Sequence, residues 1–416
     1  MRFIADFHIH SRYSRATSGD MEVETIGKWA EIKGIGLMGT GDFTHPLYLA
    51  ELKAKLEPAE GGLFRLKGPS PVRFILTAEV SNIFQQEGRL RKVHTLIFAP
   101  SFAVVDKINT NLGRLGKLSS DGRPTLTAPV KEVVKLVLDS SPDCLVIPAH
   151  AWTPWFSLFG ANSGFDSIEE CFQEESRHIS AIETGLSSNP SMNWRLSILD
   201  PISLVSNSDA HSPPKIGREA NVFQCNMDYW EITDALKNKD RNKFLFTIEF
   251  FPEEGKYHYD GHRNCGLVFS PQETRRRKGL CPSCKRRLTI GVMHRVENLA
   301  DRPEGYVPQG AIPAQHLVPL EEIIAEALNQ SVNTKAVREE YLKAVHTLGN
   351  EFFVLMDAPK EDLFRCLPAR VAEGIIRVRE RRLRIKPGYD GVYGQVSIFD
   401  EGDKGKTSAQ MELFER

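Results

Sequence analysis

MRFIADFHIH, residues 1–10, is the stretch around which the chain is organised. Its apolar beginning predicts a short buried strand, and its end places His8 and His10 two residues apart. Side chains alternate between the two faces of a strand, so these imidazoles point the same way, about 7 Å apart along the backbone. Two imidazoles so placed can share one divalent ion. The alternative is a surface strand with two incidental histidines.

The later strands of the first half repeat this pattern. Short, β-rich apolar runs recur along the chain, and each carries a side chain that can bind metal at or near its end. These side chains are Asp42, Glu79, His94, His150, Asp209 and His211. Carboxylate and imidazole together are typical ligands of zinc, manganese or iron, and a glutamate can bridge two ions. The repetition therefore favours a metal centre over incidental histidines.

This set of residues, in this order, resembles the polymerase and histidinol phosphatase (PHP) superfamily over residues 1–225. The resemblance implies an α/β fold, namely a distorted β/α barrel with metals at the carboxyl ends of its strands. It also implies one ion on His8, His10, Glu79 and Asp209, a second on Glu79, His94 and His150, and a third to which Asp42 and His211 contribute. Asp209, His211 and Glu79 are the expected catalytic residues. The second motif is Gly41-Asp42, where many members have Asp-His, so we expect two or three barrel ions (zinc, manganese or magnesium).

Composition sets outer bounds on the function. The chain has 416 residues, of which 41% are hydrophobic and 26% charged, which is typical of a globular protein with two or three domains. The net charge of −1 means that any nucleic-acid surface must be local. The sequence contains no apolar run of ~18 residues and no signal peptide, so we expect a cytoplasmic protein without a membrane partner.

A second metal site is predicted after residue 252. His262 and Cys265 are followed by Cys281 and Cys284, and two pairs spaced in this way are typical of a zinc knuckle. His258 or Asp260 could replace His262 as the fourth ligand. Such a site lets a small module fold without a large core, so we expect one structural zinc. Of the basic residues around it, we assign Arg276, Arg277 and Lys285 to contact with a phosphate backbone, although a charge run can also be a solvated face.

The chain then becomes helical. Helices are predicted over 320–329, 334–348 and 363–384, after a linker at 299–316. The predicted domains are the metal-dependent phosphoesterase barrel (1–252), the zinc-binding module (253–298), a helical DNA-binding domain (299–400) and a mobile tail (401–416).

The order of barrel, zinc knuckle and basic helical region resembles the endonuclease Q family over nearly the whole chain. The resemblance rests on GTGD (39–42), RFILTAEV (73–80), SNSDAH (206–211) and CPSC (281–284). It implies a metal-dependent endonuclease of DNA repair that nicks DNA 5′ to uracil, hypoxanthine and abasic sites. The alternatives are a PHP-type exonuclease, a small-molecule phosphoesterase, and a binding protein with an inactive barrel, which would lack the ligands.

Three further residues are candidates for contact with the damaged nucleotide. Asn207 lies on the strand that leads to Asp209, and its amide can pair with the carbonyl and ring N–H shared by uracil and hypoxanthine; the alternative is that it only orients a metal ligand. Trp152 and Trp155 follow His150 and can stack on a base; the alternative is that such aromatic residues close the barrel mouth.

The carboxyl-terminal residues QMELF (410–414) resemble the short peptide by which bacterial repair proteins bind the sliding clamp. Gln410 would bind at the rim of the clamp's pocket, and Leu413 and Phe414 would fill it. A frayed or self-docked tail is the alternative. QVSIF (395–399) fits the same pattern, but it follows a Gly-rich turn and is expected to be a strand packed on the helical domain.

Overall fold

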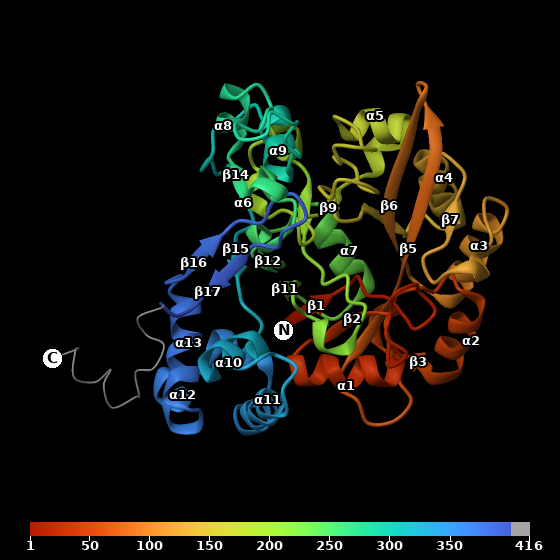
Figure 1. The fold of residues 1–416 in the computed structure, drawn as a ribbon. Helices are drawn as coiled ribbons and strands as arrows, with labels where there is room; N and C mark the ends of the chain where they lie inside the picture. The colour runs from red at the N-terminus through yellow and green to blue at the C-terminus, as the bar shows by residue number, and fades with distance from the viewer. Residues whose placement is uncertain (401–416) are drawn as a thin grey trace.

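A distorted barrel lies at the centre of the computed structural model, which describes residues 1–400 (Figure 1). Its strands are β1 (Arg2–Asp6), β2 (Leu37–Gly39), β5 (Arg73–Gln86), β6 (Arg89–Ala99), β8 (Leu145–Pro148), β9 (Ala181–Glu183) and β10 (Ser203–Val205). β1, β2 and β5 are parallel neighbours, and β6 lies antiparallel between β5 and β8. The ring closes where Ile9, beyond β1, pairs in parallel with Ala210, beyond β10. The predicted β/α barrel is confirmed.

Further strands extend the sheet away from the ring. β11 (Ala220–Gln224) pairs antiparallel with β1, and β12 (Phe244–Glu249) pairs antiparallel with β11. β15 (Ala314–His316) adds to β12 in parallel, so the segment expected as a linker contributes a strand to the main sheet. β3 (Leu56–Pro58), β4 (Phe64–Leu66) and β7 (Thr125–Leu126) complete the sheet beside β5.

Amphipathic helices cover the barrel because their apolar faces pack on its strands. They are α1 (Val23–Lys33), α2 (Pro46–Lys55), α3 (Phe102–Leu112), α4 (Val130–Ser140) and α7 (Tyr229–Lys237). The shorter α5 (Ile168–Phe172) and α6 (Pro190–Asn193) lie in its loops. α1 ends at Gly34, which takes a left-handed conformation with φ 89° and donates its N–H to the carbonyl of Ala30.

The zinc module is built from β13 (Asp260–His262), β14 (Leu267–Phe269), α8 (Pro271–Arg276) and α9 (Val292–Leu299). It stands above the barrel in Figure 1. Arg295 on α9 fastens it to the loop after β8 by donating to the carbonyls of Phe159 and Phe165 at 3.0 and 2.9 Å. Arg302 pairs with Asp200 at 2.6 Å. The module therefore has a fixed place on the barrel.

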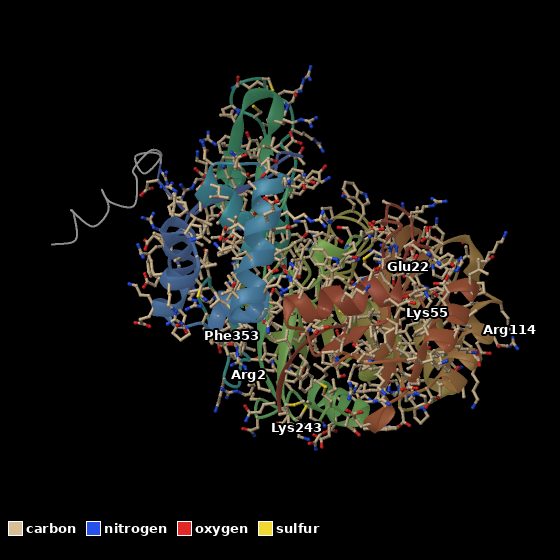
Figure 2. The ribbon with its side chains drawn as sticks, turned by 90° about the horizontal axis from the view of Figure 1, so that it is seen from below. Arg2, Glu22, Lys55, Arg114, Lys243 and Phe353 are labelled. Atoms are coloured by element: carbon tan, nitrogen blue, oxygen red, sulfur yellow. The ribbon has the colours of Figure 1, made fainter. Side chains whose placement is uncertain are left out.

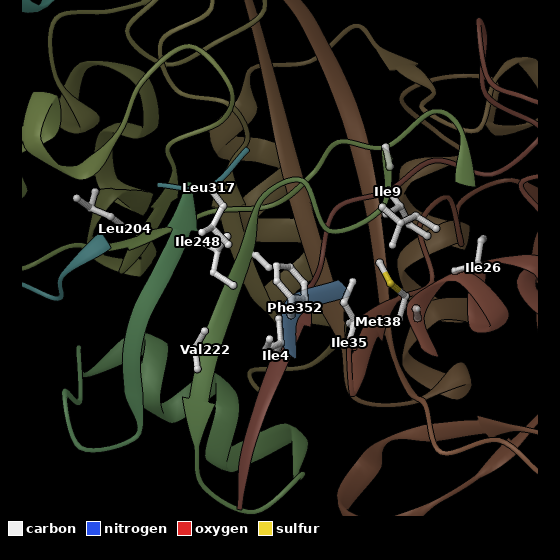
Figure 3. Packing of buried hydrophobic residues seen from close by; sticks show 14 of the residues in the cluster. Ile4, Ile9, Ile26, Ile35, Met38, Leu204, Val222, Ile248, Leu317 and Phe352 are labelled. Carbon is white, nitrogen blue, oxygen red and sulfur yellow. The ribbon is translucent and has the colours of Figure 1, made fainter. Parts of the chain in front are cut away.

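The helical region shares its core with the barrel. Figure 3 shows Phe352 and Leu317 close to Ile4 and Ile248, and all four belong to one cluster of buried side chains. Lys33 and Glu351 form a buried ion pair at 2.6 Å across the same junction. Arg2 pairs with Asp357 at 3.5 Å, and Figure 2 shows Arg2 beside the segment that carries Phe353.

Three predictions for this region meet different outcomes. α10 (Leu320–Leu328) and α11 (Lys335–Leu348) confirm the first two helices. The single helix expected over 363–384 is wrong, because α12 (Lys360–Cys366) and α13 (Ala369–Arg379) are separate helices. The break lies at Leu367-Pro368, since a proline disfavours the helical conformation of the residue before it. β16 (Arg384–Lys386) then pairs with β17 (Gln395–Ser397), and Ile398 and Phe399 are buried. The packed strand predicted for 395–399 is thus confirmed. Within residues 1–400, no helix is long and apolar enough to cross a membrane.

Candidate active site

The predicted metal-binding side chains come together at one end of the barrel. Strands β1, β2, β8 and β10 direct their carboxyl ends to the same face of the barrel. β6 runs antiparallel to its neighbours, so Glu79 and His94 reach that face from within β5 and β6. The side chains and the strands that carry them are His8 and His10 after β1, Asp42 after β2, Glu79 in β5, His94 in β6, His150 after β8 and Asp209 after β10. Side chains that are far apart in the sequence therefore lie close together in space.

A first ligand cluster consists of His8, His10 and Asp209, whose ligand atoms all lie within 4.8 Å of one another. Nε2 of His10 is 3.1 Å from Oδ1 of Asp209, and Nε2 of His8 is 3.6 Å from the same oxygen. These three atoms are buried and have no hydrogen-bond partner among residues 1–400. Because an unpaired buried polar atom costs about 1–3 kcal/mol, the convergence of three such atoms fits a shared cation.

A second ligand cluster consists of Glu79, His94 and His150, within the same 4.8 Å limit. Oε1 of Glu79 is 2.8 Å from Nδ1 of His94 and 3.0 Å from Nε2 of His150. Its other oxygen, Oε2, lies 3.2 Å from Nε2 of His10 in the first cluster. Glu79 thus contacts both clusters, as a carboxylate that bridges two ions would.

The carboxylates of the two clusters are held in their charged form, which suits cation binding. Burial opposes the charged form of Glu79, but His94 and Arg123 hold the pKa of this carboxyl well below its usual range. Arg123 reaches Oε2 of Glu79 at 3.0 Å. Burial lowers the pKa of His94 to about 4, which keeps its imidazole neutral and able to donate a lone pair. The pKa of Asp209 is also lowered, because its burial is outweighed by His8 and His10.

Two further carboxylates orient the ligands from behind. Glu183, at the end of β9, accepts from Nδ1 of His8 at 3.0 Å and from the main-chain N–H of His150 at 2.7 Å. Asp42 accepts from Nδ1 of His10 at 3.0 Å. A carboxylate on the far nitrogen of a metal-binding imidazole fixes its tautomer and orientation. Glu183 was not among the side chains expected at the site, although it ends the short strand β9.

The residues expected at a third ion are placed differently. Besides His10, Asp42 accepts from the N–H and the hydroxyl of Ser11, both at 2.6 Å, so its oxygens are bonded within the protein. His211 is half-exposed, and its ring centroid lies 4.5 Å from that of His10. Its Nδ1 donates to the carbonyl of Asp209 at 2.9 Å. Among the described residues, Asp42 and His211 do not form a ligand cluster with each other.

Asn207 has no acceptor left for a base. Its Oδ1 accepts from the N–H of Phe7 and from Nδ2 of Asn221, both at 2.9 Å, and its Nδ2 donates to Glu183 at 2.8 Å. An amide oxygen has two lone pairs, so both are used. These contacts contradict pairing of Asn207 with the damaged base and favour the alternative, in which it holds Glu183 behind His8.

The two tryptophans of the loop after His150 differ in their exposure to solvent. Trp152 is 1% exposed, donates from Nε1 to Oδ1 of Asn193 at 2.8 Å and packs on Phe159. Because its ring is buried against Phe159 and Asn193, it cannot stack on a base, and the prediction for Trp152 is wrong. Trp155 is 48% exposed and stays a candidate.

The zinc module carries a third ligand cluster. His262, Cys265, Cys281 and Cys284 place one ligand atom each within 4.8 Å of one another, as the spacing predicts. Neither alternative for the fourth ligand belongs to the cluster: His258 is buried elsewhere, and Asp260 accepts from Nδ1 of His294 at 2.6 Å. A set of three thiols and one imidazole fits zinc. The predicted phosphate contacts, Arg276, Arg277 and Lys285, are all exposed on this module.

Relatives of known sequence extend along the chain. The uncharacterised protein YqxK of Bacillus subtilis is 31% identical over 412 residues, which make up 95% of this chain and 99% of that protein. The uncharacterised protein MJ0043 of Methanocaldococcus jannaschii is 33% identical over 257 residues, which make up 60% of this chain and 31% of that protein. The family described as the MJ0043 C-terminal domain matches residues 319–382.

Two solved structures share the whole fold. The lesion-specific endonuclease PfuEndoQ from Pyrococcus furiosus superposes with a TM-score of 0.87 at 31% identity, over 100% of this chain and 99% of its own. Endonuclease Q in complex with a 27-mer duplex that has an abasic lesion at the active site superposes with a TM-score of 0.84 at 32% identity, over 98% of this chain and 100% of its own.

Proposed function

The chain belongs to the endonuclease Q family, and from that membership and its two barrel clusters we propose that it is a lesion-specific DNA endonuclease of repair. The observation that carries the proposal is the convergence of buried, unpaired ligand atoms from His8, His10 and Asp209 beside the second cluster, with Glu79 between them. A pair of adjacent metal sites can stabilise both the attacking and the leaving oxygen when a phosphodiester is hydrolysed.

We assign the ions to residues as follows. His8, His10 and Asp209 would hold one, His94 and His150 a second, and Glu79 both. Bound divalent ions would supply charge neutralisation of the phosphate and activation of water. A third ion, on Asp42 and His211, is less favoured by the hydrogen bonds of Asp42. Zinc, manganese and magnesium remain the candidates.

The chain's own residues would prepare the site for phosphate. Glu183 and Asp42 hold His8 and His10 in fixed orientations, so the clusters need little rearrangement when substrate arrives. Arg123 adds positive charge beside Glu79. His211 is half-exposed next to His10, where its imidazole can reach an oxygen of the phosphate or of the leaving nucleotide. We therefore keep Asp209, His211 and Glu79 as the catalytic residues.

We propose that the scissile bond lies 5′ to the lesion and that the products are a 3′-hydroxyl and a 5′-phosphate on the damaged nucleotide. The lesions would be uracil, hypoxanthine and abasic sites. The zinc module would contact the phosphate backbone through Arg276, Arg277 and Lys285, whose exposed positive charges can replace counterions on DNA. Its cluster would hold one structural zinc. Barrel (1–252), module (253–298) and helical region (299–400) would act as one DNA-binding unit.

One incubation tests this function. Labelled duplexes that differ only in one nucleotide (uracil, hypoxanthine, an abasic-site analogue or a normal base) are mixed with the protein and manganese or magnesium. We expect a single nick 5′ to each lesion and an intact normal duplex. Shortening of every duplex from its 3′ end would indicate an exonuclease instead. Hydrolysis restricted to small phosphate esters would indicate the other alternative.

We also propose that residues 410–414 bind the sliding clamp through Gln410, Leu413 and Phe414, a segment outside the described residues. Sequence resemblance supports this partner, and the second matching peptide is excluded as a competitor because Ile398 and Phe399 are buried. The test is titration of the clamp with the full chain and with a chain that ends at Ala409. Equal affinities would contradict the proposal. We also propose a cytoplasmic location, because the proposed substrate is DNA.

A further inference from the structure

Three segments build an exposed aromatic surface beside the active site. Trp155, from the loop after His150, is 48% exposed, and its ring centroid lies 6.5 Å from that of Tyr257 at the start of the zinc module. Tyr393, from the hairpin β16–β17, is 72% exposed. Nζ of Lys256 lies 5.8 Å from the ring centre of Tyr257 and 5.7 Å from that of Tyr393. We call Trp155, Tyr257, Tyr393 and Lys256 the aromatic platform.

The hairpin that carries Tyr393 is fixed to the zinc module. Asp390 and Gly391 both have positive φ, 44° and 83°, which is the geometry of a two-residue turn that keeps the strands twisted correctly. Oδ2 of Asp390 accepts from the N–H of Arg263 at 2.6 Å, and the N–H of Gly391 donates to the carbonyl of Lys256 at 2.9 Å. Figure 1 shows the hairpin running from the helical region toward the module. The platform is thus held in place before any substrate binds.

Hydrogen bonds connect the platform to the second ligand cluster. The hydroxyl of Thr153 lies 3.2 Å from Nδ1 of His150, and it donates to the carbonyl of Trp155 at 2.8 Å. With its single proton given to that carbonyl, the hydroxyl accepts from Nδ1–H of His150. Trp155 therefore lies two hydrogen bonds from a metal-binding imidazole, at the edge of the site where a phosphodiester would be cut.

The platform has the chemistry of a surface that receives an unpaired base. Flat aromatic rings stack on any base, and a lysine among them can neutralise the adjoining phosphate. Trp155 and Tyr393 are too exposed to serve the core, unlike Trp152, which lies three residues earlier and is buried. The combination of exposed rings and one cation fits nucleic acid better than an apolar protein partner, which would not favour Lys256 at its centre.

The geometry and the substrate together indicate which base is bound. When a damaged nucleotide leaves the duplex for the metal site, the base opposite loses its partner whatever the lesion is. An abasic lesion, such as the one at the active site of the endonuclease Q complex, brings no ring of its own. We propose that the aromatic platform stacks the base opposite the lesion and so stabilises the opened duplex. This inference rests on the proposed function.

The test compares two duplexes with the same abasic-site analogue. One has adenine opposite the lesion, and the other has a second abasic position there, so it offers no base to stack. We expect Trp155→Ala to lower kcat/KM about tenfold on the first duplex, mainly through KM, and to change it less than about twofold on the second, since only the first loses a stack. Trp155→Phe should restore most of the loss. An equal loss on both duplexes, or no loss on either, would overturn the inference.

Two further variants make the result specific. Trp230 on α7 is 46% exposed, which matches Trp155, and Trp230→Ala should leave both duplexes unaffected. Tyr393→Ala should reproduce the pattern of Trp155→Ala, and it provides a second measurement if the loop variant is unstable. Nicking by the unaltered protein distinguishes failure of the proposed function from failure of the inference about the aromatic platform. If it cuts neither abasic duplex, the proposed function fails and the inference with it; if it cuts both, only the variants decide the inference.

Discussion

Replacement of Glu183 by glutamine tests whether the carboxylates behind the histidines set up the metal centre. The two side chains have nearly the same shape, so packing in the fully buried site is preserved. The carboxylate accepts from three donors: Nδ1–H of His8, shared between both oxygens at 3.0 Å, the N–H of His150 at 2.7 Å and Nδ2 of Asn207 at 2.8 Å.

The size of the effect follows from these contacts. An amide nitrogen cannot accept, so it must face either the N–H of His150 or the amide of Asn207, and one of these donors loses its partner. An unpaired buried donor costs about 1–3 kcal/mol. Loss of a carboxylate behind a metal-binding histidine lowers affinity or activity about 10–100-fold. That range corresponds to about 1.4–2.7 kcal/mol, which agrees with one lost donor bond.

The assay is nicking of an abasic duplex at a series of manganese concentrations. We expect Glu183→Gln to need about 10–100-fold more manganese for half-maximal rate, with a partial recovery at saturation. Glu174→Gln is the matched control, because Glu174 is exposed in the segment that precedes β9 and its carboxylate pairs with Lys131 on the surface. An unchanged manganese dependence in Glu183→Gln, at full metal content, would refute the role of Glu183.

The remaining predictions concern other parts of the molecule. Asp209→Ala should abolish nicking and leave binding of an abasic duplex, measured by gel shift, within about threefold, because it removes a ligand but no DNA contact; full nicking would contradict the assignment. Asn207→Ala should reduce cutting of uracil, hypoxanthine and abasic duplexes alike, since its amide is bonded to Phe7, Asn221 and Glu183. A selective loss on the two base-bearing duplexes would restore the base-pairing hypothesis. Cys281→Ser should release the zinc of the module and weaken DNA binding while the barrel stays folded; retention of that zinc in metal analysis would contradict the ligand set. Burial raises the pKa of Glu249 from 4.5 to about 8, so the folded protein binds a proton that the unfolded chain releases. The free energy of unfolding should then fall by about 1.4 kcal/mol per pH unit between these two values, and Glu249→Gln should flatten that dependence in denaturant titrations.

The sequence alone determined which side chains are candidate ligands and what kind of fold holds them. Metal-binding residues must be His, Cys, Asp or Glu, and their positions at strand ends follow from local apolar runs that the sequence displays directly. The ligand cluster of the zinc module is the clearest case, because it consists of two pairs that are close in the sequence, His262 with Cys265 and Cys281 with Cys284.

Only the tertiary structure decided what stands behind and around those ligands. Glu183 and Asn207 are 24 residues apart in the sequence and are hydrogen-bonded to each other behind His8. Glu183 therefore orients His8, and the amide of Asn207 is not available to bind substrate. Trp152 and Trp155 share a loop and a residue type, yet Trp152 is buried and Trp155 faces solvent. Tyr393 adjoins Lys256, which also contacts Tyr257, because the β16–β17 hairpin folds onto the zinc module. Burial and long-range contact depend on how the segments pack, and no local pattern in the chain records that packing.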